Sequence, residues 1–440
     1  MTQRTDASRK AGFRGRIVWT VPRVLLVILA LALILRLGVV TGTWNAQPWG
    51  DPADYHTHGA ALALVGSYPP TNFAEPGGAS ALRPPVFPYL LGTAYQVTGV
   101  RVNAGRLIGV LLGTLAVGLV FLIARRIWGP RHALWAAGLT AVFPPLVWLS
   151  AALLSELVFV PLVLGLVLVL LRLRDRPAVL PAALAGLLLG LAVLTRTNGL
   201  LLLAPACVAV LAAQGPGRGR AAAAMLAAFA VTLIPWTARN VVALDALRPF
   251  GTQSGYTIAG QWNSEAARHG AFHAAWRSPP QVPEFADLFH RPGKSEADVE
   301  AQLRGRALRF AGDRPDHVLA ATALNTQRMF EAGPGHTFVS QIAHREMGIP
   351  AGSRGGVQLS VYALVLFALV GAVVLVRRRQ LGPVWFWLVP VVLFAGVAPL
   401  LGSPRYRAPI DPFLLMLGAV AIVQLKDRLR SRAPHLDQRN

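Results

Sequence analysis

Apolar residues are grouped along the chain in long blocks separated by short polar segments. Runs of about twenty mostly apolar residues, rich in Leu, Val, Ile and Ala, have the length that crosses a bilayer as one helix. They lie at 24–43, 104–124, 132–149, 153–171, 178–195, 199–214, 221–237, 357–376, 383–402 and 409–425. The pattern predicts an all-α polytopic membrane protein with about ten transmembrane helices.

Every second polar segment is basic. Counting inward from the N-terminus, the basic segments are 1–23, 125–126, 172–176, 215–220, 377–379 and 426–432. Because Lys and Arg accumulate in cytoplasmic loops, both termini are predicted to be cytoplasmic, with a basic N-terminus at 1–23 and a tail at 426–440. The first run ends without an Ala-x-Ala cleavage site, so we interpret it as a retained anchor.

The segments on the opposite side are longer and more varied. A loop at about 44–103 interrupts a transmembrane core at 24–237, an extracytoplasmic segment spans 238–355, and C-terminal transmembrane helices follow at 356–425. Within the extracytoplasmic segment we predict an amphipathic helix across 295–311, with Ser295 as its cap. Its apolar face would carry Val299, Leu303, Leu308 and Phe310.

Composition supports a membrane protein and narrows its partners. The 440 residues are 54% hydrophobic and 14% charged, with a mean hydropathy of +0.49. The net charge of +22 would suggest nucleic acid in a soluble protein, but here the Arg residues lie in short turns between spans. We interpret them as topology signals that also contact lipid headgroups, and we predict a multi-pass protein of the plasma or inner membrane with no nucleic-acid partner. The single cysteine, Cys207, rules out disulfides as an organising feature.

Few carboxylates lie near the predicted outer face. Of 20 acidic residues, eleven fall in the extracytoplasmic segment, where a solvated surface is the default interpretation. A charged residue at the centre of a transmembrane helix costs about 2.5–3.5 kcal/mol and usually has a partner or a task. The acids near the outer face are Asp51, Asp54, Glu75, Glu156 and Asp411.

Asp51 and Asp54 have the spacing that places two side chains on one face of a helix. Asp51 precedes Pro52, which suits a helix start with Asp51 as the cap. The alternative is a general base, which accepts a proton from an attacking hydroxyl or amine. His56 and His58 follow; surface hydrogen bonding is the usual role of such histidines, and metal ligation is the alternative.

Arginines near the outer face are the candidate cations. Arg83 stands before two prolines, where it either extends toward the interface or stabilises a phosphate. Arg196, Arg405 and Arg407 lie at outer helix ends, where the positive-inside rule disfavours them, and we interpret them as functional. For Glu156, one turn into a span, we expect a structural pair with an outer arginine.

Several ordered motifs between about 24 and 425 resemble the GT-C membrane glycosyltransferases, in particular bacterial relatives of the protein O-mannosyltransferases and aminoarabinose transferases. The motifs are Asp51-x-x-x-Tyr55, Arg83-Pro84-Pro85, Phe143-Pro144-Pro145, Leu154-Ser155-Glu156-Leu157-Val158-Phe159, Leu194-Thr195-Arg196-Thr197-Asn198-Gly199 and Arg405-Tyr406-Arg407-Ala408-Pro409. The segment at 238–355 carries little of the resemblance.

The resemblance implies an enzyme that transfers a hexosyl or pentosyl group, with inversion, from a polyprenyl-phosphate donor to an extracytoplasmic glycan, lipid or protein. Asp51 would be the catalytic base, with Asp54 as the alternative, and Arg83 would contact the phosphate. Together with the candidates at the outer face, the predicted substrate-binding residues are Tyr55, His56, Arg83, Glu156, Arg196, Arg405 and Arg407. Tyr55 would position the base. No cofactor is required and no metal ligand is assigned, although a divalent metal stays an alternative.

Two other functions fit parts of the pattern. A transporter or flippase for an anionic lipid or solute explains the helices and the charges near them, but alternating access places key charges near the midplane rather than on one face. A non-catalytic member of the same family is the third interpretation. The presence of both Asp51 and Arg83 argues against it.

Overall fold

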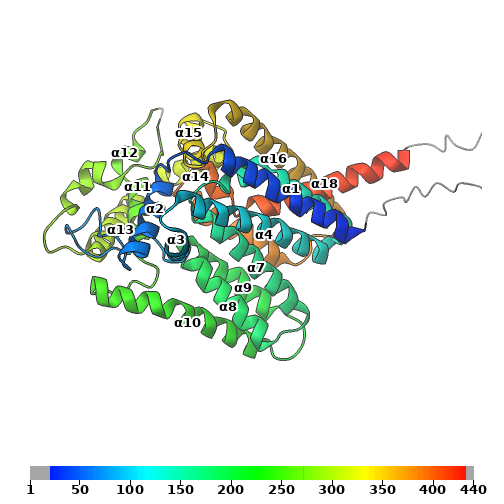
Figure 1. The fold of residues 1–440 in the computed structure, drawn as a ribbon, viewed down its shortest axis with the longest axis horizontal. Helices are drawn as coiled ribbons and strands as arrows, with labels where there is room; N and C mark the ends of the chain where they lie inside the picture. Colours follow the sequence, from blue (N-terminus) through cyan, green and yellow to red (C-terminus); the bar gives the residue numbers. More distant parts are fainter. Residues whose placement is uncertain (1–19, 271, 433–440) are drawn as a thin grey trace, which may run out of the picture.

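The computed structural model describes residues 20–270 and 272–432, and these residues form helices and turns without a β-strand (Figure 1). The all-α fold is therefore confirmed. Each predicted apolar run is largely helical. The helices are α1 Val21–Gly42, α4 Val102–Trp128, α5 Pro130–Val142, α6 Pro144–Leu149, α7 Glu156–Asp175, α8 Val179–Val193, η1 Thr197–Leu202, α9 Leu203–Leu211, α10 Arg218–Leu244, α16 Arg354–Arg377, α17 Val384–Val397 and α18 Asp411–Arg432.

Five helices within the described residues are long and apolar enough to cross a bilayer, so the chain is a multi-pass membrane protein. They are α1, α4, α7, α10 and the helical stretch Ala351–Arg377. Shorter apolar helices such as Val179–Val193 and Val384–Val397 accompany them, and the total of ten spans stays a prediction. At the centre lies α7, most of whose side chains are buried in one apolar core between α4 and α8.

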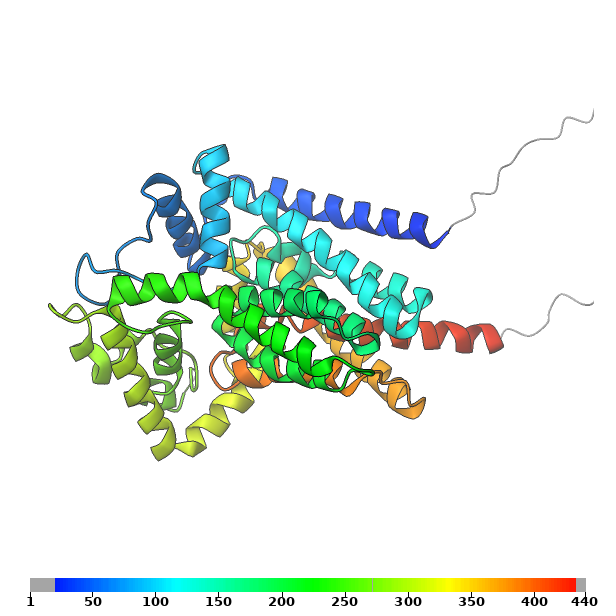
Figure 2. The ribbon, with the colours of Figure 1, turned by 90° about the horizontal axis from the view of Figure 1, so that it is seen from below.

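The basic turns gather at one end of the bundle. In Figure 2 the start of α1 and the end of α18 lie at this end, which we call the proximal end. Hydrogen bonds join its turns: Trp128 Nε1 donates to the Gln380 carbonyl at 3.1 Å, and the Gln214 amide donates to the Arg174 carbonyl at 3.0 Å. This clustering agrees with the charge alternation. Which side of a membrane it faces stays a prediction, and residues 1–19 and 433–440 of the predicted cytoplasmic termini lie outside the described residues.

The predicted span at 132–149 is broken into α5 and α6, and a buried arginine of α1 stabilises the break. The carbonyls of Thr140 and Ala141 would normally accept from the amides of residues 144 and 145, but Pro144 and Pro145 have no N–H. Arg36 donates to both carbonyls instead, from Nη2 to Thr140 at 3.5 Å and from Nη1 to Ala141 at 3.2 Å. This lone guanidinium inside an apolar span therefore has a structural partner.

The remaining elements lie at the opposite end, which we call the distal end (Figure 2). They are α2 Asp51–Leu64, α3 Val86–Thr98, α11 Gln253–Gln261, α12 Ser264–Ala267, η2 Pro279–Gln281, η3 Pro283–Leu288, α13 Glu296–Asp313, α14 Pro315–Met329, α15 His336–Glu346, η4 Ala351–Ser353 and η5 Pro404–Arg407. The predicted amphipathic helix is α13. Its capping box, formed by Ser295 and Asp298, confirms the cap, and Val299 and Leu303 are buried as expected, whereas Leu308 is exposed.

Buried carboxylates of α13 bind the loop that leads to α3 and the start of α11. Glu296 accepts the Ala81 amide at 2.7 Å and also bonds the Thr252 hydroxyl. Glu300 accepts the buried amide of Gly255 at 3.2 Å. A solvated surface is therefore the wrong interpretation for these two acids, because each satisfies groups that are themselves buried. The contact at Ala81 fixes the backbone two residues before Arg83.

Candidate active site

The N-terminus of α2 places Asp51 at the distal end. Gly50 caps the helix with a φ of 70°, a conformation that favours glycine, and Asp51 is the first helical residue. The interpretation of Asp51 as the cap is therefore wrong. The Asp51 side chain makes no cap bond to the helix; its carboxylate contacts two arginines instead.

Arg83 bridges the two aspartates of α2. Its Nη2 donates to Asp51 Oδ1 at 2.6 Å, and its Nε donates to Asp54 Oδ2. The guanidinium also lies over the ring of Tyr55, 4.8 Å from the centroid, and that ring packs edge-on against Phe87. Because Pro84 and Pro85 follow Arg83, the backbone there is fixed before α3 begins. The spacing of Asp51 and Asp54 on one helical face thus creates a site for one planar cation.

Arg405 binds the other oxygen of Asp51. Its Nη2 donates to Asp51 Oδ2, and its Nε lies 3.3 Å from Glu346 Oε2. Glu346 also accepts the backbone amide of Asp51 through Oε1 at 3.4 Å. We call Asp51, Asp54, Arg83, Glu346 and Arg405 the distal cluster. It joins the first outer loop, the end of α15 and the turn before α18.

Glu346 is the member of the cluster that the sequence analysis missed. It was grouped with the solvated acids of the extracytoplasmic segment, yet its side chain is only 8% exposed. The signal available in the sequence was its position, eight residues before α16 and thus close to the distal end of a span. A Cβ at Gly50 would lie 2.8 Å from Glu346 Oε1, so this contact also requires glycine at the cap.

The surroundings of the three carboxyl groups in the cluster shift their pKa values in different directions. Burial favours the neutral form of Asp51, but Arg83 and Arg405 outweigh burial and hold the pKa of this carboxyl well below its usual range. Burial opposes ionisation of Asp54 too, yet a hydrogen bond from His58 and the charge of Arg83 lower its pKa. For Glu346, burial dominates, and with the nearby charge of Asp51 it raises the pKa to about 7 despite Arg405. Two acids thus favour the ionised form, whereas the third, Glu346, favours the neutral form far more than an ordinary carboxyl does.

A second buried pair lies beside the cluster. Glu156, the first residue of α7, has Oε1 2.9 Å from Arg196 Nη1, and the same nitrogen donates to Ser155 Oγ at 3.0 Å. The expected structural pair of Glu156 with an outer arginine is therefore present. Tyr406 connects it to the cluster, because both Arg196 and Arg405 lie over its ring, at 5.1 and 4.8 Å from the centroid.

The predicted aromatic and histidine contacts are distributed around α2. Tyr55 lies under Arg83, so it positions this arginine rather than Asp51 directly. His56 projects to α3, where its Nδ1 is 2.9 Å from the Tyr95 hydroxyl. His58 lies behind Asp54, with Nδ1 3.4 Å from Oδ1 of that carboxylate. The structure thus brings Tyr55 to the cluster, whereas the hydrogen bond of His56 is to α3.

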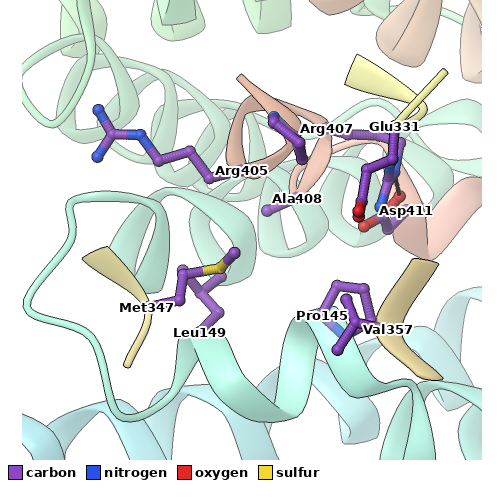
Figure 3. A pocket seen from close by; sticks show the side chains of 10 residues that line it. Pro145, Leu149, Glu331, Met347, Val357, Arg405, Arg407, Ala408 and Asp411 are labelled. Carbon is purple, nitrogen blue, oxygen red and sulfur yellow. Dashed lines mark hydrogen bonds and ion pairs between the residues drawn. The ribbon is translucent and has the colours of Figure 1, made fainter. Parts of the chain in front are cut away.

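Arg407 lies apart from the cluster although it is two residues from Arg405. The two side chains diverge at a small pocket (Figure 3), and Arg407 extends toward α18. It is buried, pairs with Asp411 at 2.6 Å and donates to the Met329 carbonyl at 2.5 Å. These contacts explain Arg407 and Asp411 as a clamp between η5, α14 and α18.

The residues of the cluster do not fit a metal centre in this arrangement. The described residues include no group of three or more His, Cys, Asp or Glu side chains placed to hold a metal ion. The oxygens of Asp51 that such an ion would use are engaged by Arg83 and Arg405. We therefore derive the chemistry of the site from its carboxylates and guanidinium groups.

Comparison with known proteins finds a family match for part of the sequence and structural matches for the fold. Residues 82–238 match the family described as dolichyl-phosphate-mannose-protein mannosyltransferase. This stretch contains Arg83, Glu156 and Arg196, which supports the resemblance to GT-C enzymes; Asp51, Glu346 and Arg405 lie outside it. A search of curated proteins finds no match to the chain.

Solved structures share the architecture. The archaeal oligosaccharyltransferase AglB from Archaeoglobus fulgidus, in complex with an inhibitory peptide and a dolichol-phosphate, is 16% identical with a TM-score of 0.55, over 96% of this chain and 53% of that one. The apo form of the same enzyme is 15% identical with a TM-score of 0.54, over 96% of this chain and 52% of that one. ArnT from Cupriavidus metallidurans bound to undecaprenyl phosphate is 16% identical with a TM-score of 0.46, over 94% of this chain and 81% of that one. The two AglB matches show a GT-C-type fold, and the chain spans about half the length of AglB.

Proposed function

We propose that the chain is an integral-membrane glycosyltransferase of the plasma or inner membrane. It transfers a hexosyl or pentosyl group, with inversion, from a polyprenyl-phosphate donor to an extracytoplasmic glycan, lipid or protein. The observation that carries the proposal is the distal cluster, where Asp51 contacts two arginines at the end of an apolar helical bundle. The family matched by residues 82–238 is described by a dolichyl-phosphate-mannose donor, and AglB is described in complex with dolichol-phosphate.

The cluster supplies the parts that this reaction needs. The donor phosphate binds the guanidinium groups of Arg83 and Arg405, which now hold carboxylates. Loss of these contacts raises the basicity of Asp51, which accepts the proton of the acceptor hydroxyl or amine. The acceptor atom forms its bond to the anomeric carbon while the carbon–oxygen bond to phosphate breaks, and that electron pair leaves with the polyprenyl phosphate. The arginines stabilise the additional negative charge.

Asp51 is the favoured base because it is the carboxylate shared by both arginines. Asp54 contacts one arginine and is further held by His58, so it orients Arg83. The ring of Tyr55 packs against the guanidinium of the same arginine. Arg196 and Glu156 support Arg405 through Tyr406. In this proposal Asp54, Tyr55, Glu156 and Arg196 hold the phosphate-binding cations in place.

The test compares Asp51→Asn and Asp54→Asn in membranes supplied with a radiolabelled polyprenyl-phosphate sugar. Removing a general base costs about 10²–10⁴-fold in rate. We expect Asp51→Asn to lose transfer to this extent and Asp54→Asn to lose less. A matched control is Asp287→Asn, which removes an exposed carboxylate paired with Arg306 at 2.6 Å in the same distal region.

The results distinguish the alternatives. Transfer by both variants at the parental rate would show that neither aspartate is the base, and a larger loss in Asp54→Asn would reverse their roles. If the parent transfers sugar from none of the donors but moves an anionic lipid or solute across the membrane, the chain is a transporter or flippase instead. A parent with neither activity supports the non-catalytic alternative.

A further inference from the structure

The distal cluster holds more acids than bases. Each guanidinium is shared by two carboxylates: Arg83 by Asp51 and Asp54, and Arg405 by Asp51 and Glu346. With all five groups ionised, three negative charges face two positive ones. The neighbouring pair of Glu156 and Arg196 is balanced and does not change this difference. The cluster as it stands has no cation to spare for an anionic ligand.

A phosphodiester brings one further negative charge to this site. Burying an uncompensated charge is costly, so the ligand must be accompanied by a cation or by neutralisation of an acid. A proton is the smallest such compensation. Protonation of a carboxylate bound to Arg83 or Arg405 would also free N–H donors of that guanidinium for phosphate oxygens.

We propose that the binding of a lipid phosphodiester is coupled to the uptake of one proton by Glu346, which releases Arg405 from Glu346 to the phosphate. This inference rests on the proposed function, because it assumes that the cluster binds the donor phosphate. Glu346 is thereby a positioning residue that acts through Arg405.

The geometry selects Glu346 among the three acids. Its contact with Arg405 is the longest ion pair of the cluster, 3.3 Å, and it touches one arginine, whereas Asp51 touches two. Glu346 faces negative charge from α2 at Asp51 and from α7 at Glu156, and the cation that faces it is Arg405 of η5. Asp54 is stabilised from both sides, by Arg83 and by His58.

The pKa directions agree with this selection. Two arginines hold the pKa of Asp51 below its usual range, and His58 together with Arg83 lowers that of Asp54, whereas burial raises the pKa of Glu346 to about 7. Phosphate binding adds negative charge next to Glu346 and raises its pKa further. Binding therefore strengthens as the pH falls through the pKa of the free protein, because the form that takes up the ligand already carries the proton.

The test measures binding of a polyprenyl methyl phosphate to the full-length protein in detergent micelles. This probe is a phosphodiester without a sugar, so it is inert to transfer and its own charge is constant between pH 6 and pH 8. The pKa of Glu346 in the protein without ligand is about 7. If only the protonated form binds the probe, its dissociation constant should be about tenfold larger at pH 8 than at pH 6. Titration calorimetry in two buffers of different ionisation enthalpy should show uptake of about 0.9 proton per ligand at pH 8 and about 0.1 at pH 6.

Glu346→Gln removes the titrating group and keeps an amide oxygen for the Asp51 backbone amide. We expect it to bind the probe at pH 8 as tightly as the parent does at pH 6, with no proton uptake at either pH. The control Asp287→Asn, in an exposed pair with Arg306, should retain the parental pH dependence.

Three outcomes would overturn the inference while leaving the proposed function intact. They are a parental affinity equal at both pH values, an unchanged pH dependence in Glu346→Gln, and loss of binding by Glu346→Gln at both pH values while Asp287→Asn binds. The last result would show that the carboxylate itself is required. A parent that does not bind the probe at either pH contradicts lipid-phosphate recognition, and the proposed function fails together with the inference.

Discussion

Replacing Arg83 tests whether this arginine is a catalytic cation or only extends to the membrane interface. The sequence allowed either role, and the structure shows the guanidinium donating to Asp51 and Asp54 with a side chain only 11% exposed. Arg83→Gln leaves both carboxylates without their shared cation. Arg83→Lys keeps the charge, but one ammonium cannot reproduce the planar fork that reaches two acids.

The expected magnitude follows from this burial. Breaking a buried ion pair on one side costs about 3–5 kcal/mol of stability, because it leaves an uncompensated charge. We therefore expect Arg83→Gln to unfold at a clearly lower temperature in detergent, and Arg83→Lys to lie between it and the parent. Transfer from a polyprenyl-phosphate sugar should fall by about 10²–10³-fold in Arg83→Gln, the usual effect of removing one preorganised stabilising donor.

A double variant distinguishes structural loss from catalytic loss. Adding Asp54→Asn to Arg83→Gln removes one of the unpaired acids, so it should recover part of the stability without recovering transfer. The matched control is Arg126→Gln at the proximal end, where an exposed pair with Asp175 at 2.7 Å should contribute at most about 1 kcal/mol. If Arg83→Gln unfolds and transfers sugar like Arg126→Gln, Arg83 is an interfacial residue and the reasoning is refuted.

Three further substitutions test the surrounding scaffold. Arg36→Leu leaves two buried carbonyls at the end of α5 unpaired, at about 1–3 kcal/mol each, so thermal unfolding should occur at a lower temperature; an unchanged midpoint would contradict the capping role. Gly50→Ala places a Cβ against Glu346 at a φ of 70°, and both transfer and stability should fall, whereas equal activity would show that the α2 terminus adapts. Glu156→Gln leaves Arg196 without its carboxylate. If Arg196 supports phosphate binding, this variant should raise KM for the donor more than it lowers kcat. A change confined to kcat would place Glu156 in the chemical step.

The sequence predicted the features that depend on residues close together in the chain. Apolar runs gave the helices because bilayer-spanning segments are set by local hydrophobicity, and Ser295 was recognised as a cap because its partner Asp298 is three residues away. The i, i+3 spacing likewise placed Asp51 and Asp54 on one face. These predictions needed no knowledge of how the helices pack.

Contacts between distant segments were beyond such reasoning. Glu346 reaches Asp51 across 295 positions, and its burial depends on how α15 meets η5. The interpretation of Asp51 as a cap was wrong because the competing attraction of Arg405, far along the chain, carries no local signal. Arg36 did leave a signal, an arginine inside an apolar run together with the Pro144-Pro145 break, but the two became a pair only when α1 packed on α5.

The central claim is that the distal cluster transfers sugar from a lipid phosphate. The most direct measurement is the transfer of radiolabelled sugar from a panel of polyprenyl-phosphate donors to acceptors in a membrane extract. Proteoliposomes would contain the parent or the double variant Asp51→Asn, Asp54→Asn. The account predicts acceptor-dependent transfer by the parent with at least one donor and none above background by the double variant. Transfer by the double variant at the parental rate, or no transfer by the parent with any donor, would contradict it.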